Sequence, residues 1–321
     1  MDTTLVLTHD CNLGCPYCYA GEKFGKEMRN EVADAAIELA LSDSPNHIFF
    51  SFFGGEPFLA FDAMKRATER AHTTFAERGI EHRFVVTTNG TALSSPRIDF
   101  LKRWNFFVGF SIDGTREAHA IRPFTTGKDS FDAVLAGLKA VQDAGIPYRT
   151  ISVVDPSNVR YLGDTVEFLA SQGVLRMALN PNYDAEWTEE DLEYWAAGYR
   201  RAAEIYVDSY RAGRPLRINT IDDNIKAHVK GGHTPLDQCD FGRSSVAVAP
   251  SGNLYPCERL VGEDRDHSYV IGNVFDGFSP RRTGLIETSG NSCDDCGDCA
   301  LQTRCSSWCA CANLADTGKH N

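Results

Sequence analysis

The chain has 321 residues, of which 42% are hydrophobic and 24% are charged, and its formal net charge is −12. This composition is that of a globular protein with a full hydrophobic core and about two domains, and the excess of acidic residues argues against nucleic acid as the main partner. We predict a cytoplasmic location and no membrane anchor, because no apolar run approaches the roughly 18 residues of a membrane span and the N-terminal residues lack the basic region of a signal peptide.

The eleven cysteines are the most unusual feature of the composition. In a chain without an export signal they favour metal ligands over disulfides, because the cytosol keeps thiols reduced. Cys11, Cys15 and Cys18 follow an apolar run that we predict as the first strand, Thr4–Thr8. Their spacing can close a loop around an iron–sulfur cluster and leaves one iron of a four-iron cluster without a protein ligand. A structural zinc loop or a redox pair is the alternative, although zinc prefers four ligands and no fourth ligand with suitable spacing stands nearby.

Apolar runs and amphipathic helical patterns alternate from residue 3 to about residue 185, which is typical of a parallel α/β sheet or barrel. The predicted strands are Thr4–Thr8, Ile48–Phe53, Arg83–Thr88, Phe106–Ile112, Tyr148–Val154 and Leu175–Leu179. The predicted helices between them are Val32–Leu41, Phe61–Glu77, Pro96–Trp104, Ser130–Ala144 and Val159–Ser171. In such folds the active site lies at the carboxyl ends of the strands.

Unusual motifs follow three of these strands. Strand two leads into Gly54-Gly55-Glu56-Pro57, where two glycines let the backbone approach a ligand and Glu56 offers a carboxylate to an ammonium group. An ordinary glycine turn that opens a helix is the alternative. Strands three and four end in Thr88-Asn89-Gly90 and Ser111-Ile112-Asp113-Gly114, which are small, polar and turn-forming. Each of these two motifs also fits plain turn chemistry.

A cysteine-rich module forms roughly the last quarter of the chain. Before it, residues 187–212 predict one long helix capped by Thr188, and Asp222–Val229 predicts a shorter helix. Within it, Val246–Ala249 and Asn253–Pro256 flank a Pro-Ser-Gly turn as a β-hairpin. The module holds eight cysteines, which are Cys239, Cys257, Cys293, Cys296, Cys299, Cys305, Cys309 and Cys311. One or two zinc ribbons are the alternative to iron–sulfur clusters, because Cys-x2-Cys spacing fits zinc well.

The first cysteine loop, with an aromatic residue before its last cysteine, resembles the cluster loop of the radical S-adenosylmethionine (SAM) enzymes. This resemblance implies an α/β fold in which residues 1–186 form a partial (β/α)6 TIM-like barrel. It implies that the Gly-Gly-Glu-Pro motif holds the amino group of SAM, that the end of strand four lies near the nucleoside, and that Arg122 contacts SAM or pairs with a surface acid. The residues implied to bind SAM are Tyr17, Gly54, Gly55, Glu56, Pro57, Asn89, Ser111, Asp113 and Arg122.

The later cysteines are similar to the SPASM domain that follows the barrel in peptide-modifying members of this family, through the spacings Cys239-x12-Gly252-x4-Cys257 and Cys296-x2-Cys299-x5-Cys305-x3-Cys309. The resemblance implies a helical bridge at 187–238, a SPASM domain at 239–321, and two auxiliary clusters that bring the total to three [4Fe–4S] clusters. Cys239, Cys257 and Cys309 are implied to serve the auxiliary cluster nearer the barrel, and Cys296, Cys299 and Cys305 the outer one. Cys293 and Cys311 stay unassigned, because the family's last ligand normally comes many residues after the Cys-x3-Cys pair.

The resemblance implies an oxidoreductase that cleaves SAM reductively to a 5′-deoxyadenosyl radical, with electrons from a flavodoxin- or ferredoxin-type donor. We expect it to modify side chains of a ribosomally synthesised precursor peptide oxidatively, as in the formation of a crosslink. A sulfatase maturase that forms formylglycine and a non-catalytic zinc or electron-transfer protein are the alternatives. In the related sulfatase-maturing enzymes an acidic residue after the cysteine that matches Cys257 is the catalytic base, which makes Glu258 a candidate, although a surface glutamate is the plainer interpretation.

Only ten residues precede Cys11. We therefore expect no N-terminal leader-recognition domain of the kind that many related maturases carry. The precursor peptide would then bind to the barrel and the cysteine-rich module, or to a separate leader-recognition protein.

Overall fold

The computed structural model describes residues 1–43, 45–233, 237, 239–288, 299–300, 304–305 and 309–317. Two cysteines that the sequence singles out, Cys293 and Cys296, lie outside these residues. Among the described residues no helix is long and apolar enough to cross a membrane.

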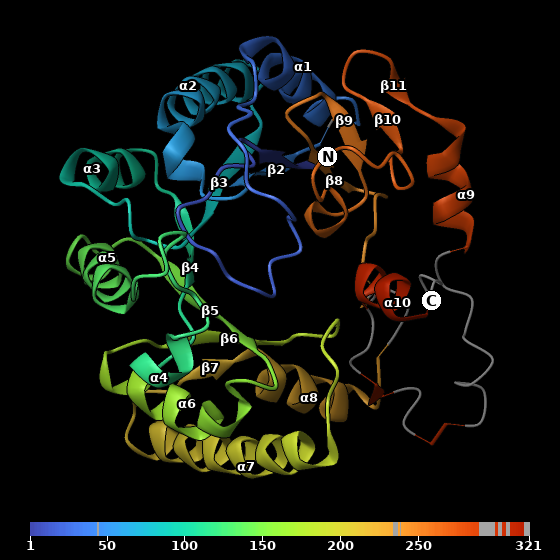
Figure 1. Cartoon of the computed structure of the whole chain (residues 1–321). Helices are drawn as coiled ribbons and strands as arrows, with labels where there is room; N and C mark the ends of the chain where they lie inside the picture. Colours follow the sequence, from blue (N-terminus) through green and yellow to red (C-terminus); the bar gives the residue numbers. More distant parts are fainter. Residues whose placement is uncertain are drawn as a thin grey trace.

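The first part of the chain is a curved parallel sheet with helices on its outer face (Figure 1). It comprises β1 (Asp2–Val6), α1 (Asn30–Ala40), β2 (His47–Phe53), α2 (Phe61–Glu77), β3 (Glu81–Thr88), α3 (Ser95–Arg103), β4 (Phe107–Ser111), α5 (Phe131–Asp143), β5 (Tyr148–Val154), α6 (Leu162–Ser171) and β6 (Arg176–Pro181). Short helical turns lie at Pro57–Ala60, Arg116–His119 (α4) and Val159–Tyr161. The predicted alternation of six strands and five helices is confirmed.

The sheet extends beyond these six strands on both sides. Its order is β11-β10-β9-β8-β1-β2-β3-β4-β5-β6-β7. The predicted hairpin is present as β8 (Ser245–Val248) and β9 (Asn253–Tyr255), and β8 pairs in parallel with β1 from Asp2↔Ser245 to Leu5↔Val248. The remaining strands have two residues each. Strand β7 (Arg217–Ile218) pairs with β6. Strand β10 (Gly272–Asn273) pairs with β9, and β11 (Gly277–Phe278) pairs with β10. The cysteine-rich module therefore continues the same sheet.

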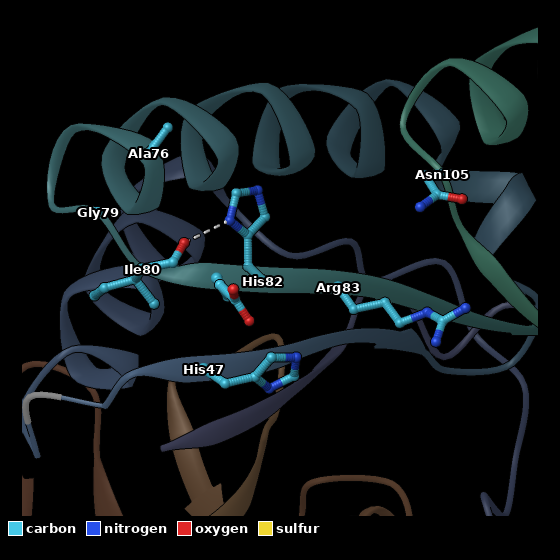
Figure 2. A pocket seen from close by; sticks show the side chains of 8 residues that line it. His47, Ala76, Gly79, Ile80, His82, Arg83 and Asn105 are labelled. Atoms are coloured by element: carbon cyan, nitrogen blue, oxygen red, sulfur yellow. Dashed lines mark hydrogen bonds between the residues drawn. The ribbon is translucent and has the colours of Figure 1, made fainter.

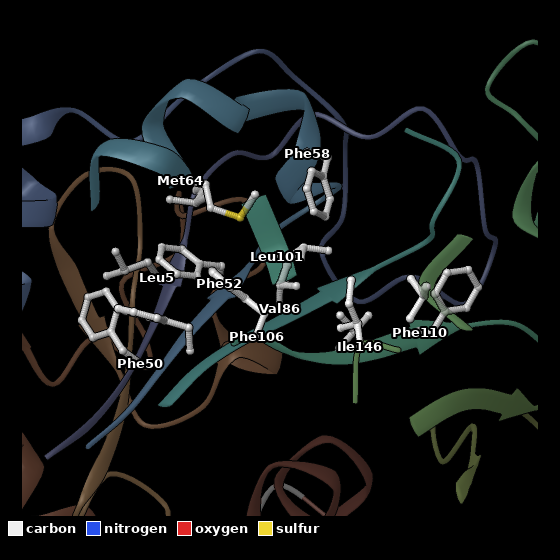
Figure 3. Close-up of a cluster of buried hydrophobic side chains, with 14 of the residues drawn as sticks. Leu5, Phe50, Phe52, Phe58, Met64, Val86, Leu101, Phe106, Phe110 and Ile146 are labelled. Atoms are coloured by element: carbon white, nitrogen blue, oxygen red, sulfur yellow. The ribbon is translucent and has the colours of Figure 1, made fainter. Parts of the chain in front are cut away.

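Phenylalanine side chains fill the space between the sheet and the helices (Figure 3). Strand β2 shows the pattern that causes this, because Ile48, Phe50 and Phe52 are buried while Phe49 between them is 42% exposed. Each fully buried side chain of this size contributes about 1.5–3 kcal/mol to folding. This core fixes the strands and so positions the loops at their carboxyl ends.

Two helices link the barrel to the cysteine-rich module. Helix α7 (Glu189–Arg211) begins at a capping box in which Thr188 and Asp191 bond reciprocally, as the sequence predicts for its cap. Helix α8 (Asn219–Lys230) ends at Gly231, whose φ of 84° is the left-handed conformation that suits glycine. The two helices are joined by the Tyr206 hydroxyl, which donates to Asp222 Oδ1 at 3.1 Å. Helices α9 (Pro280–Thr288) and α10 (Ala310–Thr317) follow, and the sequence pattern predicts neither.

Candidate functional site

The loop that carries Cys11, Cys15 and Cys18 follows β1 at the carboxyl end of the sheet. The start of the loop is bonded to the end of β2, because Leu7 N donates to Phe53 O at 2.9 Å. Its middle is held by the segment after α4, where Gly14 N donates to Pro123 O at 2.8 Å and Thr125 N donates to Asn12 O at 2.9 Å. All three thiols are half-buried. The loop is therefore a fixed feature of the fold with its sulfurs partly accessible.

Burial controls the protonation of these thiols. It raises the pKa of Cys11 to about 12 and also raises the pKa of Cys15. Lys23 Nζ lies 2.9 Å from Cys18 Sγ and donates to it. Because thiolates are the metal-binding form, metal binding here would release protons. In the part of the chain that the structure describes, no three His, Cys, Asp or Glu side chains converge on a single ion, and a cluster in which each thiolate binds its own iron does not need such convergence.

The Gly-Gly-Glu-Pro motif packs against the backbone of the cysteine loop. Gly55 N donates to Thr8 O and Glu56 N donates to Asp10 O, each at 2.9 Å. A Cβ atom on Gly54 would lie 2.4 Å from Thr8 O, and one on Gly55 would lie 2.1 Å from Asp10 O. Gly54 also has φ of +140°, which side chains rarely allow. The close approach that these glycines permit is thus to the protein's own cysteine loop, and both remain half-buried beside it.

Replacing Gly55 by alanine is expected to lower the free energy of unfolding by about 1–3 kcal/mol, because overpacking against backbone forces a shift. Urea denaturation of the metal-free protein measures this loss. Gly25→Ala is the matched control, since nothing lies within 4 Å of its added Cβ, and it should change stability by less than about 0.5 kcal/mol. Equal stability of the two variants would contradict the packing argument.

Glu56 joins the ends of β2 and β3. Its side chain is fully buried, and its carboxylate accepts from Phe58 N at 3.0 Å, Thr88 Oγ1 at 2.8 Å and Asn89 N at 2.8 Å. Burial raises the pKa of Glu56, and these three bonds act in the opposite direction. These three donors satisfy most of the roughly four acceptor positions of a carboxylate. Pro57 is buried at the start of the helical turn that follows.

Asn89 lies directly against the cysteine loop. Its Nδ2 donates to Asn12 Oδ1 at 2.9 Å and lies 3.9 Å from Cys11 Sγ. Asn12 in turn donates to Thr91 Oγ1 at 2.7 Å. The structure therefore brings together the ends of β1, β2 and β3, where the sequence places its first candidate residues.

Asp113, after β4, is the centre of a buried ion pair. It accepts from Arg122 Nε at 2.6 Å, Arg122 Nη2 at 2.9 Å, Tyr17 Oη at 2.8 Å and Val153 N at 2.8 Å. The Arg122 guanidinium also lies over the Tyr17 ring, 5.2 Å from its centre. Arg122 and Asp113 are 7% and 2% exposed, so the acid that Arg122 meets is a buried one rather than a surface one. Ser111 is half-buried at the end of β4.

His119, in α4, supports this pair. Its Nδ1 accepts from Asp113 N at 3.1 Å, and its Nε2 lies 3.2 Å from Ser130 Oγ, which donates to Arg122 O. This arrangement needs a neutral imidazole, since Nδ1 must accept. Burial is the main cause that lowers the pKa of His119 to about 4. The sequence assigns His119 no role, and only its place between Asp113 and Arg122 points to it.

The lowered pKa of His119 should make the stability of the protein depend on pH. Unfolded His119 binds a proton below a pKa of about 6.5, whereas folded His119 stays neutral down to about 4. The unfolded state therefore binds more protons in this window, and stability falls as pH falls from about 6.5 to 4. We expect urea denaturation of metal-free His119→Gln to show a shallower loss than the wild type, by up to about 3 kcal/mol. Parallel pH profiles would contradict this assignment.

A second group of thiols lies at the start of α10. Cys311 Sγ is 3.5 Å from Cys257 Sγ and 3.3 Å from Cys309 Sγ, and the sulfur of Cys239 accepts from the backbone N–H of Ala310, next to Cys309. We call Cys239, Cys257, Cys309 and Cys311 the inner thiol group. Cys299 and Cys305 are exposed. The structure thus gathers the three cysteines implied to share a cluster and adds Cys311 to them.

Tyr19 lies between the two sets of thiols. Its ring stacks on Phe53 with 6.3 Å between centroids, and the Arg259 guanidinium lies 5.6 Å from its centre. Burial raises the pKa of Tyr19 well above its usual range, and the next contributions come from Glu258, Cys257 and then Cys18. The side chain still keeps 38% exposure, so part of the ring is accessible from outside. The sequence did not single out Tyr19, although it directly follows Cys18.

Glu258 and Arg259 approach Tyr19 from the cysteine-rich module. Glu258 Oε2 lies 3.8 Å from Cys257 Sγ. Arg259 pairs with Asp184, in the loop after β6. Three segments, from the cysteine loop, the end of β6 and the β9 side, therefore meet around Tyr19.

The segment after Cys18 is clamped to the cysteine-rich module. Glu22 N donates to Glu263 Oε1 at 2.9 Å, and Arg265 pairs with Glu22 at 3.1 Å while it lies over the Phe24 ring. Lys26 Nζ lies 3.5 Å from the buried carboxylate of Asp264. The position of the first cysteine loop therefore depends on residues more than two hundred positions later in the chain.

A separate hollow lies away from these residues. A pocket of about 590 Å³ is lined by His47, Ala76, Gly79, Ile80, Glu81, His82, Arg83 and Asn105 (Figure 2). It lies at the amino ends of β2 and β3, opposite the cysteine loop, whereas active sites of this type of fold lie at the carboxyl ends of the strands. His82 is held within the protein, with Nδ1 3.1 Å from Ile80 O and Nε2 3.0 Å from His72 Nδ1. We do not place the functional site there.

Comparison with known proteins agrees with this geometry. The family model of the Radical SAM superfamily matches residues 5–169, just over half of the chain. An uncharacterized protein of Methanocaldococcus jannaschii is 32% identical over 53% of this chain and 58% of its own length, so the match spans less than two thirds of that relative. A cysteine-type anaerobic sulfatase-maturating enzyme of Clostridium novyi is 24% identical over 94% of this chain and 85% of its own length.

Two solved structures share the fold over nearly the whole chain. Native anSMEcpe with bound AdoMet and Kp18Cys peptide has a TM-score of 0.82 at 20% identity and covers 96% of this chain and 88% of its own. SuiB of Streptococcus suis bound to the precursor peptide SuiA has a TM-score of 0.66 at 17% identity and covers 99% of this chain and 73% of its own. These likenesses establish the fold and confirm the predicted α/β class.

Proposed function

Because the chain belongs to the radical SAM superfamily of enzymes, we propose that it is a maturase that uses SAM to oxidise side chains of a peptide. The family implies SAM and one [4Fe–4S] cluster. The donor set fits that cluster, since three half-buried thiols lie on one fixed loop. When bound, SAM and the clusters supply a 5′-deoxyadenosyl radical and an acceptor for one electron. The protein positions the reactants and excludes water.

The chain's own residues divide this work. Cys11, Cys15 and Cys18 hold the cluster. The peptide carbonyl groups of the Gly54-Gly55-Glu56 segment take the SAM ammonium group, and the buried Glu56 carboxylate holds that segment against Thr88 and Asn89. The buried pair of Asp113 and Arg122 fixes the wall behind Tyr17, and Ser111 and Asn89 line the same end of the sheet.

An oxidative reaction is supported by one observation, which is that the inner thiol group lies on the other side of Tyr19 from the first cysteine loop. A substrate that loses a hydrogen atom to the radical must lose one more electron and a proton to give a product with two hydrogens fewer. A second cluster near Tyr19 would take the electron, and Glu258 would take the proton. On this basis we propose that the cysteine-rich module holds two auxiliary clusters and begins near residue 239. We also propose that an external flavodoxin- or ferredoxin-type protein donates electrons.

The first candidate substrate is a ribosomally synthesised precursor peptide, in which the oxidation forms a crosslink. The fold shared with the SuiB complex supports it. We propose that the barrel and the cysteine-rich module bind the precursor, directly or through a separate leader-recognition protein. The second candidate is conversion of a sulfatase Cys or Ser to formylglycine, favoured by the match to the Clostridium novyi enzyme over 94% of the chain.

One set of assays tests both candidates. The iron-loaded enzyme is incubated anaerobically with SAM and dithionite, and 5′-deoxyadenosine is measured. No 5′-deoxyadenosine from the loaded wild-type chain would overturn the enzyme assignment. In a second assay the Kp18Cys peptide is added and its mass is measured. Loss of the elements of hydrogen sulfide and gain of one oxygen atom indicate that its cysteine has become formylglycine. Loss of two hydrogens from a short peptide encoded beside this chain and produced with it, with the Kp18Cys peptide unchanged, indicates precursor maturation.

Glu258→Gln is expected to slow peptide modification by about a hundredfold or more, because a positioned proton acceptor contributes about 10²–10⁴-fold. SAM cleavage should persist, so the ratio of 5′-deoxyadenosine to product peptide should rise. Glu186→Gln is the control, since that exposed side chain lies in the loop beside Asp184. An unchanged ratio for Glu258→Gln would remove Glu258 as the base.

A further inference from the structure

The inner thiol group holds one cysteine more than the sequence resemblance assigns to it. Cys311 Sγ lies between two sulfurs, at 3.5 Å from Cys257 and 3.3 Å from Cys309. Both distances are well beyond the roughly 2.05 Å of a disulfide. The structure therefore shows free thiols that share one location rather than a bonded pair.

The start of α10 explains how cysteines two residues apart can reach one point. Within a helix, side chains at i and i+2 point to different faces. Cys309 precedes the helix, which begins at Ala310, so its side chain is free of that restriction. Cys239 reaches the same place from the other side, since the backbone N–H groups of Phe241 and Ala310 donate to its sulfur. Four thiols from three segments thus surround the first turn of α10.

Cys311 is also separated from the outer cysteines. It is 3% exposed and packs with Phe241 and Ala310, whereas Cys299 and Cys305 are exposed. Cys311 therefore belongs with the sulfurs at the start of α10 and not with the outer cysteines.

We propose that Cys311 is the fourth thiolate ligand of the inner auxiliary cluster, together with Cys239, Cys257 and Cys309. This proposal rests on the proposed function, which supplies the cluster. Four thiolates leave no iron of a four-iron cluster open, in contrast to the loop at Cys11. The substrate then cannot bind to this cluster directly, and contacts around Tyr19 and Arg259 must select it.

The test uses the full chain with Cys11, Cys15 and Cys18 replaced by alanine, so that all bound iron belongs to auxiliary sites. Adding Cys311→Ala should lower the iron content by about one atom per chain or more and change the electron paramagnetic resonance (EPR) spectrum of the reduced protein. Ala312→Ser, at a neighbouring buried position of the same helix, should change neither. An iron content and spectrum equal to the parent's would overturn the proposal, as would zinc in place of iron in the parent.

Two additions keep the result decisive. Cys311→Ser is nearly isosteric and keeps an oxygen ligand, so if Cys311→Ala fails to fold, a spectrum of the serine variant identical to the parent's overturns the proposal and a shifted one supports it. 5′-Deoxyadenosine formation by the otherwise wild-type chain is measured separately. Its absence would defeat the proposed function, whereas the iron content and spectrum judge the ligand assignment alone.

Discussion

Replacing Cys15 by alanine is expected to abolish 5′-deoxyadenosine formation, with a loss greater than about a hundredfold. In the proposed function Cys11, Cys15 and Cys18 are the three protein ligands of the cluster that binds SAM, so the loss of one leaves two. Even mutation of groups that only hydrogen-bond to metal ligands lowers metal affinity or activity about 10- to 100-fold. Anaerobic incubation of the reconstituted variant with SAM and dithionite, followed by chromatography of the nucleosides, measures the effect.

The matched control is Cys305→Ala, which removes an exposed cysteine from the other end of the chain. This variant should still cleave SAM, because it leaves the loop at Cys11 intact. Wild-type rates from Cys15→Ala would show that this loop does not hold the reactive cluster. Equal losses in both variants would mean that SAM cleavage depends on all the clusters together.

Arg122→Met is expected to lower the free energy of unfolding by about 3–5 kcal/mol, because it leaves the Asp113 carboxylate buried without its charged partner. Tyr17 and Val153 continue to donate to that carboxylate but do not neutralise it. The loss is measured by urea denaturation of the metal-free protein near pH 7. Adding Asp113→Asn should recover part of it, since the second change removes the unpaired charge.

Arg116→Met provides the comparison at an exposed site. Arg116 pairs with Asp129 and Asp132, and its side chain is 46% exposed, so its loss should lower the free energy of unfolding far less than the loss of Arg122. Similar losses from Arg116→Met and Arg122→Met would contradict the role of burial. A double variant no more stable than Arg122→Met would show that the guanidinium contributes mainly through packing.

The elements with strong local patterns could be predicted from the sequence. Helix Phe61–Glu77 and strand Tyr148–Val154 have the predicted bounds, because apolar spacing and glycine or proline boundaries are encoded within each segment. Strand β1 is displaced, at Asp2–Val6 rather than Thr4–Thr8, since its end is set by its partners. Strand β7 has two residues and exists only through its pairing with Arg176 and Met177. No local pattern identifies such a strand.

In the candidate site, too, local motifs could be predicted from the sequence, whereas contacts between distant segments could not. Motifs at the strand ends indicate where the site lies, and the structure places Gly54, Glu56 and Asn89 against the cysteine loop. Their partners could not be predicted, because spacing does not tell which donors occupy a carboxylate. Asp113 accepts four hydrogen bonds from three residues of three segments, and Arg122 donates two of the four. Cys311 joins its group only through the position where α10 begins.

The pairing of β8 with β1 has a consequence for the order of folding. During synthesis β1 emerges first, yet one of its edges stays open until residues 245–248 are available. A parallel strand with an unpaired edge is a template for association with other chains, and contacts between such distant residues form slowly. A nascent barrel that ends before Ser245 is therefore predisposed to aggregate. Its first cysteine loop also lacks the clamp at residues 263–265, so cluster insertion is best suited to the complete chain.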